Sequence, residues 1–192
     1  MPDGTPGGKP PNASLANLAN IITFGRLCAV PLAFWLVLEH KVAWAFILFV
    51  AAGLSDALDG WLARRYGSNA IGAIMDPVAD KALLVTMYIT LAAVGSLPPW
   101  LAILVVFRDL LIVGGVVVLA VLGHAVTIHP LYISKVNTVM QIMLVGLSLL
   151  RDGFGLGVPG LPLLLTWCVA ATTLASGAAY VWNTAHGRQV GG

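Results

Sequence analysis

The sequence predicts an all-α membrane protein built as a six-transmembrane-helix bundle. Of the 192 residues, 59% are hydrophobic and only 9% are charged, and the mean hydropathy is +0.92. This composition is typical of a membrane domain and not of a soluble one. Six long apolar segments, separated by Gly- and Pro-containing breaks, are each long enough to cross a bilayer as a helix. The net charge of +2 is too small to suggest binding of nucleic acid.

The chain divides into two short tails and one membrane domain. Residues 1–16 are predicted to be a disordered tail because they are rich in Pro and Gly and lack an apolar run. They show neither a signal-peptide core nor the pattern of a mitochondrial presequence, so a bacterial inner membrane is the simplest expected location. The membrane domain is expected over 17–187, with a C-terminal tail at 188–192. Its predicted helices are 20–38, 42–65, 72–95, 99–122, 132–150 and 161–183.

The Lys and Arg residues predict the orientation of the domain. If the connection between the second and third helices faces the cytoplasm, seven basic residues lie at or near that side, two lie opposite and Arg108 lies inside a helix. The seven are Lys9, Arg26, Arg64, Arg65, Lys81, Lys135 and Arg188, and the two are Lys41 and Arg151. An excess of basic residues is typical of the cytoplasmic side.

Half of the eight acidic residues fall within the 26 positions from Asp56 to Lys81. Asp56 and Asp59 are spaced i, i+3, and Asp76 and Asp80 are spaced i, i+4, so each pair lies on one face of its own helix. Acids in apolar helices are costly unless they are paired or bound to metal, which makes them functional candidates. Four carboxylates from two facing helices predict an all-oxygen site for hard divalent cations such as Mg²⁺ or Mn²⁺.

Small residues accompany these acids. Gly60 and Ala63 share the face of the first acidic pair, Gly72 stands four positions before Asp76, and Arg64 is placed to meet an anion. The alternative is a helix pair that packs through small residues. In that case the acids would pair with Arg64, Arg65 and Lys81.

Three other helices contribute polar groups. Asn20, Thr23 and Arg26 follow one edge of the first helix, where Arg26 either meets an anion or extends its side chain to the membrane interface. In the fourth helix Arg108 is expected to bind an anion, or to interact structurally with one of the four aspartates or with a backbone carbonyl. Asp109 points about 100° away from it and is a poor partner. In the fifth helix Ser134, Thr138 and Gln141 share a face flanked by Lys135. They predict an anion and hydroxyl site, or for Lys135 alone a solvated helix start.

The acidic segment resembles the signature of the CDP-alcohol phosphotransferase family, D-x2-D-G-x2-A-R-x8-G-x3-D-x3-D. Eight positions match, although only seven residues separate Arg64 from Gly72 where the pattern has eight. The Asn20-x2-Thr23-x2-Arg26 motif is similar to the first helix of this family. The run Ser134-Lys135-Val136-Asn137-Thr138-x2-Gln141 most resembles that of the CMP-forming cardiolipin synthases within it.

The resemblance implies an integral-membrane enzyme, usually a homodimer, in which an alcohol attacks a CDP-linked lipid and CMP leaves. Asp56, Asp59, Asp76 and Asp80 would hold two divalent ions, and Asp80 would also act as the general base. The donor site would comprise Asn20, Thr23, Arg26, Gly60, Ala63, Arg64 and Gly72. The acceptor site would comprise Arg108, Ser134, Lys135, Thr138 and Gln141.

For the substrates, the resemblance favours CDP-diacylglycerol as donor and phosphatidylglycerol as acceptor, giving cardiolipin. Glycerol 3-phosphate as acceptor, which defines the phosphatidylglycerophosphate synthases, is the alternative. A divalent-cation transporter is a more remote hypothesis, because the sequence shows neither the repeats nor the paired broken helices that are common in transporters.

Overall fold

The structure, a computed structural model, describes the backbone of residues 13–66, 70–121 and 132–186, and the side chains of residues 24–56, 79–112, 114, 132–180 and 182. These residues form six helices and no strand, so the all-α prediction is confirmed. The helices are α1 (Ala13–Leu38), α2 (Val42–Tyr66), α3 (Ala70–Ala93), α4 (Pro99–Val121), α5 (Tyr132–Phe154) and α6 (Leu161–His186).

Two predicted boundaries need correction. Helix α1 begins at Ala13, inside the predicted tail, and α5 continues to Phe154 instead of ending at residue 150. The physical reason is that a helix needs only continuous backbone hydrogen bonds, whereas the prediction located apolar residues. Residues 1–12 and 187–192, the outer parts of the two predicted tails, lie outside the described residues.

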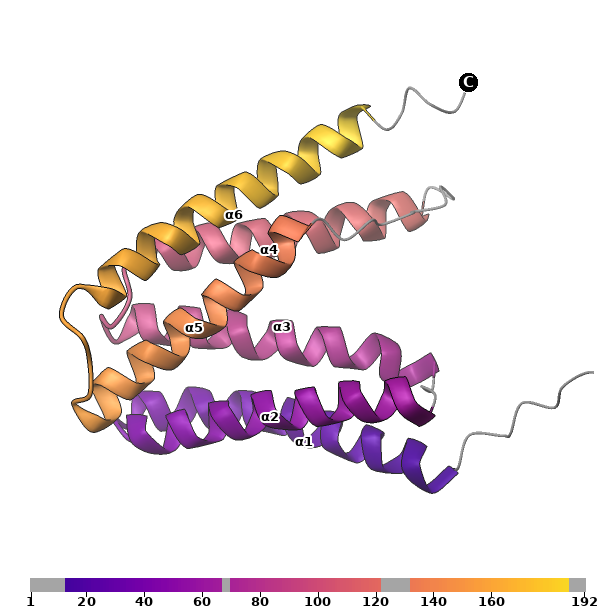
Figure 1. Ribbon diagram of the computed structural model, residues 1–192, viewed down its shortest axis with the longest axis horizontal. Coiled ribbons are helices and arrows are strands. Elements are labelled where there is room, and N and C mark those ends of the chain that lie inside the picture. Colours follow the sequence, from indigo (N-terminus) through magenta and orange to yellow (C-terminus); the bar gives the residue numbers. More distant parts are fainter. Residues whose placement is uncertain (1–12, 67–69, 122–131, 187–192) are drawn as a thin grey trace, which may run out of the picture.

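The α1–α2 and α3–α4 connections are tight because a residue in the left-handed conformation follows two positions after the end of α1 and of α3. His40 has φ 56° and Gly95 has φ 80°. The next amide in each case bonds five residues back, Lys41 N to Leu36 O at 2.8 Å and Ser96 N to Leu91 O at 2.8 Å. This is the Schellman pattern of helix termination. Figure 1 shows that these turns and the α5–α6 connection lie at the same end of the bundle.

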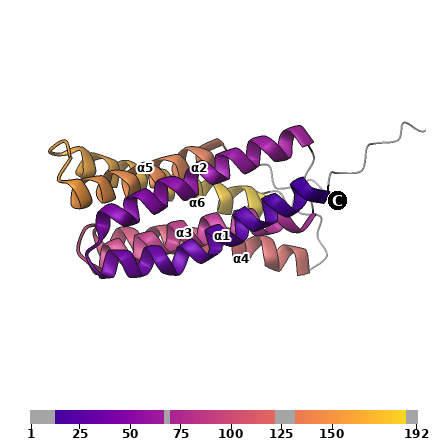
Figure 2. The same ribbon diagram turned by 90° about the horizontal axis from the view of Figure 1, so that it is seen from below.

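Helix α3 is central to the packing. It contacts α1, α4 and α5, while α2 packs on α1 and α5, and α6 packs on α4 and α5 (Figures 1 and 2). Fully buried apolar side chains from three helices meet in the core. They are Met87, Tyr88 and Leu91 of α3, Leu101 and Val105 of α4, and Leu144, Val145 and Leu149 of α5.

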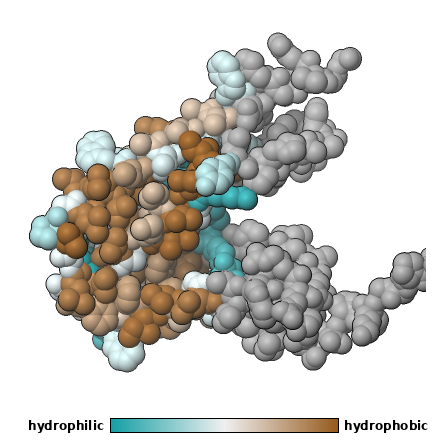
Figure 3. Space-filling view, viewed as in Figure 1, coloured by the Kyte–Doolittle hydropathy of each residue, from teal (hydrophilic) through white to brown (hydrophobic). Residues whose placement is uncertain are grey.

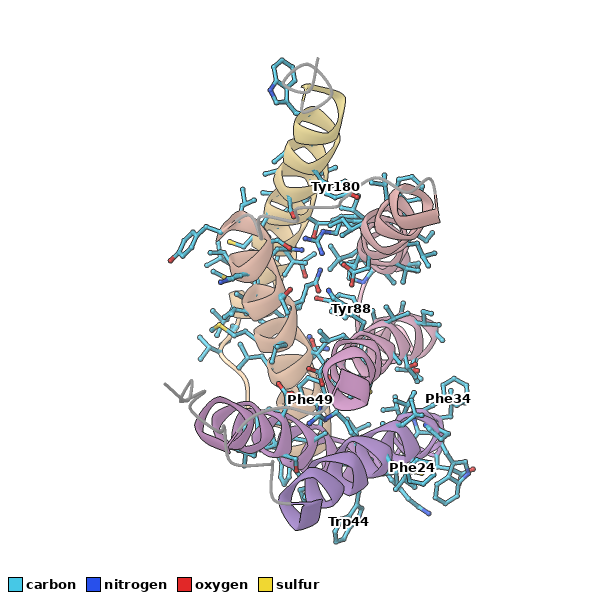
Figure 4. The ribbon with its side chains drawn as sticks, turned by 90° about the vertical axis from the view of Figure 1, so that its right-hand side faces the viewer. Phe24, Phe34, Trp44, Phe49, Tyr88 and Tyr180 are labelled. Carbon is cyan, nitrogen blue, oxygen red and sulfur yellow. The ribbon has the colours of Figure 1, made fainter. Side chains whose placement is uncertain are left out.

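The outer surface is apolar, as expected of a protein that faces lipid. Every helix exposes large hydrophobic side chains, and Figure 4 shows Phe24, Phe34 and Trp44 pointing away from the bundle. Among the described residues, the stretches Tyr132–Phe154 and Leu161–Tyr180 are long and apolar enough to cross a membrane. Shorter apolar helical stretches are Phe24–Leu38 and Val42–Asp56. Hydrophobic residues cover most of the coloured part of the face in Figure 3, and the most strongly hydrophilic ones lie in a recess at its right-hand border.

Candidate functional site

Arg26 joins two acids of the signature segment. Its Nη1 donates to Asp80 Oδ1 at 2.7 Å and to Asp56 Oδ1 at 3.1 Å, and so links α1 to both α3 and α2. Asp56 and Asp80 therefore both accept from the same nitrogen, although 24 positions separate them in the sequence. The fold thus brings together an acid from each of the predicted pairs.

The exposures of these three side chains differ in a way that suits ligand binding. Arg26 is 1% exposed, whereas the carboxylates of Asp56 and Asp80 are 45% and 37% exposed. The guanidinium of Arg26 is therefore held inside the bundle, while the carboxylates of Asp56 and Asp80 remain accessible to a ligand. Extension of Arg26 to the membrane interface, one of the two alternatives from the sequence, is wrong, because its side chain is buried and pairs with Asp56 and Asp80 inside the bundle.

A small cavity adjoins this cluster between α1 and α2. Its volume is about 270 Å³, and its lining residues are Gly25, Arg26, Ala29, Leu48, Ala51, Ala52 and Ser55. Most of these residues are small, which leaves space directly beside the buried guanidinium.

The donor set fits a hard divalent cation as far as the structure describes it. Asp56 and Asp80 offer carboxylate oxygens from two helices within a short distance of each other, which is the ligand type that Mg²⁺ and Mn²⁺ prefer. Among the described side chains, no three His, Cys, Asp or Glu residues gather around one point. The side chains of Asp59 and Asp76 lie outside the described residues, and their positions are one turn along α2 and α3 toward the α2–α3 connection.

Six predicted donor-site residues also have side chains outside the described part. Their backbones belong to α1, α2 and α3, in the order predicted. They are Asn20, Thr23, Gly60, Ala63, Arg64 and Gly72.

A second charged cluster lies deeper, between α3 and α4. Asp109 Oδ2 accepts from Lys81 Nζ at 2.8 Å, and Asp109 Oδ1 accepts from Arg108 Nη1 at 2.6 Å. The expectation that Asp109 is a poor partner for Arg108 is therefore wrong, because the arginine side chain is long enough to span the 100° between neighbouring helical positions. Lys81 pairs with Asp109 and with neither Asp56 nor Asp80, the two signature acids whose side chains the structure describes. Its pairing with Asp59 or Asp76, part of the packing alternative, lies outside the described residues.

The same arginine reaches two further helices. Arg108 Nη2 donates to Ser134 Oγ of α5 at 2.6 Å and to Ser176 Oγ of α6 at 2.5 Å. Two residues predicted for the acceptor site, Arg108 and Ser134, are thus in direct contact. Thr138 Oγ1 bonds the Ser134 carbonyl of its own helix at 3.1 Å, and Lys135 is exposed.

Buried polar residues continue along α5 below this cluster. Asn137 Oδ1 accepts from Thr172 and Thr173 of α6 at 2.8 and 2.9 Å. Gln141, the last predicted acceptor residue, is fully buried, and in the described part of the chain its amide nitrogen and oxygen have no hydrogen-bond partner. The Tyr88 hydroxyl donates to the backbone carbonyl of Gln141 at 3.4 Å, and the Tyr88 side chain lies between α3 and α5 (Figure 4).

Sequence reasoning did not select Lys81, Asp109 and Ser176 as site residues. Ser176 could have been found from the spacing of Thr172, Thr173 and Ser176, which places three hydroxyls near one face of α6. For Lys81 and Asp109 the signal was their charge in apolar surroundings, but the sequence gives no indication that they are partners.

Comparison with known proteins agrees with this geometry. A family model described as CDP-alcohol phosphatidyltransferase matches residues 16–182. The chain belongs to this family. This membership accounts for the acidic segment, of which Asp56 and Asp80 meet at Arg26, and the family is generally dependent on divalent metals.

Similar proteins of the family differ in the acceptor that their names state. A phosphatidylglycerophosphate synthase described as probable, from Mycobacterium tuberculosis, is 41% identical over 72% of this chain and 68% of its own length. The chloroplastic CDP-diacylglycerol–glycerol-3-phosphate 3-phosphatidyltransferase 1 of rice is 39% identical over 85% of this chain and 56% of its own length. A CMP-forming cardiolipin synthase of Streptomyces coelicolor is 30% identical over 82% of this chain and 76% of its own length. Against three of the most similar relatives, the chain spans 33% to 59% of their length.

Proposed function

We propose that this protein transfers a phosphatidyl group from CDP-diacylglycerol to phosphatidylglycerol, giving cardiolipin and CMP. The observation that carries the proposal is the position of Asp56 and Asp80 on Arg26, which gathers the acids of two helices at one point. The family and the CMP-forming cardiolipin synthases among its relatives support it.

Each part of the cluster has a role in this reaction. Asp56, Asp59, Asp76 and Asp80 would hold two Mg²⁺ or Mn²⁺ ions, which when bound neutralise charge on the diphosphate and on the departing CMP. Arg26 is buried beside the acids and donates to the diphosphate, together with Asn20, Thr23 and Arg64. Gly60, Ala63 and Gly72 leave space for the cytidine. Asp80 accepts the proton of the attacking hydroxyl group, because it is the last acid of the signature and remains partly exposed.

The acceptor side of the proposal uses the second charged cluster, in which Arg108 of α4 reaches Ser134 of α5. Arg108 and Ser134 bind the acceptor headgroup, Lys135 and Thr138 border it, and Gln141 contributes amide groups one to two turns deeper along α5. Arg108 suits this role because it is an arginine with fixed partners on several helices, so that little side-chain freedom remains to be lost on binding.

The second candidate is phosphatidylglycerophosphate synthesis, with glycerol 3-phosphate as acceptor. The 41% and 39% identities to proteins named for that activity favour it, since they exceed the 30% to the Streptomyces cardiolipin synthase. Both reactions use the same donor and release the same product, so only the acceptor distinguishes them.

We further propose that all six helices cross the membrane, that the acids open to the cytoplasm and that two copies form a homodimer. A bacterial inner membrane is the proposed location. The exposed apolar side chains on every helix support the first of these proposals. The distribution of basic residues supports the second.

The test is CMP release by the purified chain in lipid nanodiscs with CDP-diacylglycerol and Mg²⁺, with each acceptor supplied separately. Release that depends on phosphatidylglycerol supports cardiolipin synthesis, whereas release that depends on glycerol 3-phosphate establishes the second candidate. Asp56→Asn and Asp80→Asn are expected to reduce release to background with either acceptor. Asp152→Asn, at the far end of α5, is the matched control, and full activity of either signature variant would contradict the carboxylate site.

A further inference from the structure

Asp109 pairs with two cationic side chains, Lys81 and Arg108. The proposed function assigns no shared role to these two cations. Asp109 is 5% exposed, and each of its oxygens forms an ion pair, with Lys81 Nζ at 2.8 Å and with Arg108 Nη1 at 2.6 Å. Lys81 directly follows Asp80 on α3, so this pair of cations begins beside the proposed general base.

The charges of the cluster do not balance. Lys81 and Arg108 carry two positive charges and Asp109 carries one negative charge, and in the described part of the chain these cations pair with no other carboxylate. Among the described side chains one positive charge is therefore left over, in a cluster whose Arg108 and Asp109 are buried. Such a charge is costly unless it meets an anion.

Two features show where an anion can bind. Arg108 is buried, yet its Nε has no hydrogen-bond partner among the described residues, so one strong donor remains available. The side chain of Lys81 is 33% exposed, so part of it is accessible from outside. A phosphate oxygen is the usual partner of such a lysine–arginine pair.

We propose that Lys81 and Arg108 together bind the phosphate of the acceptor substrate, and that Asp109 is the positioning residue that holds both cations in place. This inference rests on the proposed function, in which the acceptor carries a phosphate group. Lys81 has a long, flexible side chain, and Asp56 and Asp80 are acids in the neighbouring cluster. Without Asp109, Lys81 is free to turn toward them, and Arg108 loses one of its three partners.

A purely structural role for Asp109 makes a different prediction. If its ion pairs only join α3 to α4, their loss lowers stability and affects both substrates alike. If Asp109 positions the two cations, loss of its ion pairs weakens binding of the acceptor substrate alone, because the donor substrate binds at Arg26 and the signature acids.

The experiment measures initial rates of CMP release by the full chain in nanodiscs. The acceptor is varied at saturating CDP-diacylglycerol, and the donor is varied at saturating acceptor. Asp109→Asn and Lys81→Met are each expected to raise the acceptor KM about tenfold or more, with the donor KM unchanged within about twofold. Lys81→Arg restores much of the loss. The acceptor KM of the double variant, Asp109→Asn with Lys81→Met, is little higher than that of either single variant, because Asp109 acts partly through Lys81.

The far end of the molecule provides matched controls. Asp152 also follows an arginine with which it pairs, Arg151 Nε to Asp152 Oδ1 at 2.7 Å, and Lys41 lies over the ring of Trp35. Asp152→Asn and Lys41→Met make the same chemical changes away from the site and leave both KM values unchanged. Lys81 is partly exposed, so Lys81→Met remains informative if Asp109→Asn fails to fold.

Several outcomes would overturn the inference. Equal rises in both KM values, a fall in kcat alone, or Lys81→Arg no better than Lys81→Met would each show that the cluster does not bind the acceptor. The wild-type protein tests the proposed function separately: release with glycerol 3-phosphate only overturns cardiolipin synthesis and leaves the KM comparison valid. If neither acceptor drives release, the proposed function fails. The phosphate site is then judged by thermal stabilisation with glycerol 3-phosphate, which must occur in the wild type and disappear in Lys81→Met.

Discussion

Arg26 occupies the position of a counter-ion in the candidate site, since it is buried while the two acids it contacts are partly exposed. A fixed cation beside carboxylates weakens the binding of any second cation by Coulomb repulsion and strengthens the binding of an anionic diphosphate. These opposite effects give Arg26 an experimental signature that a merely structural arginine lacks.

We therefore expect Arg26→Met to bind Mn²⁺ about 5- to 10-fold more tightly than the wild type, which corresponds to ~1 kcal/mol for unit charges a few ångströms apart in a solvated site. CMP release falls about 100-fold or more, because a buried charged donor to the substrate is lost. Electron paramagnetic resonance titration of free Mn²⁺ measures the first effect, and the rate of release measures the second. Arg151→Met, which removes another aspartate-paired arginine, changes neither, and unaltered Mn²⁺ affinity in Arg26→Met would contradict the proposed arrangement.

Gln141 and Asn137 provide a contrast between two buried amides one turn apart on α5. Asn137 Oδ1 accepts hydrogen bonds from two threonine hydroxyls, and only its Nδ2 lacks a partner among the described residues, whereas both amide atoms of Gln141 lack one. Burying an amide without partners costs about 1–3 kcal/mol. Gln141→Met, of similar shape, is therefore expected to raise the free energy of unfolding in an SDS titration, while Asn137→Leu lowers it by a similar amount. If Gln141→Met is as damaging as Asn137→Leu, the Gln141 amide is satisfied in the protein by a bound molecule such as water.

At the scale of helices, the backbones of α2 and α5 approach each other closely at Gly153. A Cβ atom at this position would lie 2.7 Å from Ala43 N, 2.8 Å from Ala43 Cα and 3.0 Å from Val42 C. All three atoms belong to the backbone, so no side chain can rotate away. The start of α2 or the end of α5 would have to move.

Gly153→Ala is accordingly expected to lower the free energy of unfolding by about 1–3 kcal/mol, as overpacking does in well-packed interiors. SDS titration of the protein in bicelles measures this change. Gly146→Ala on the same helix has no atom within 4 Å of the added methyl group and should be neutral or slightly stabilising. Equal stability of the two variants would show that α2 and α5 do not meet as described.

The helices themselves could be predicted from the sequence because long apolar runs separated by Gly and Pro leave few alternatives. Their contacts could not. Nothing in the spacing of Arg26, Asp56 and Asp80 indicates that one nitrogen bonds both acids, since this depends on how α1 packs against α2 and α3. The Arg108–Asp109 pair was predicted wrongly because helical geometry fixes the direction of Cβ and not the reach of a long side chain.

At the scale of the whole molecule, the described connections lie at one end of the bundle and the candidate site lies toward the other. The α1–α2, α3–α4 and α5–α6 turns form the first end (Figure 1). Asp56 and Asp80 lie near the middle of α2 and α3, where the apolar stretch Val42–Asp56 ends. An apolar layer that begins at the turns and ends at the acids would place the acids at the membrane surface, open to water.

Orientation in the membrane can be tested with single cysteines in a chain whose Cys28 and Cys168 are replaced by Ala. Val158→Cys in the α5–α6 turn and Tyr132→Cys at the start of α5 report on opposite ends, and both positions are exposed. In intact bacterial cells stripped of their outer membrane, an impermeant maleimide is expected to label Val158→Cys at once and Tyr132→Cys only after the cells are opened. The reason is that Lys and Arg predominate at the end that carries Tyr132, and positive residues stay in the cytoplasm. The reverse pattern would place the acids outside the cell, where nucleotide-linked lipid is not supplied, and would contradict the proposed cytoplasmic site.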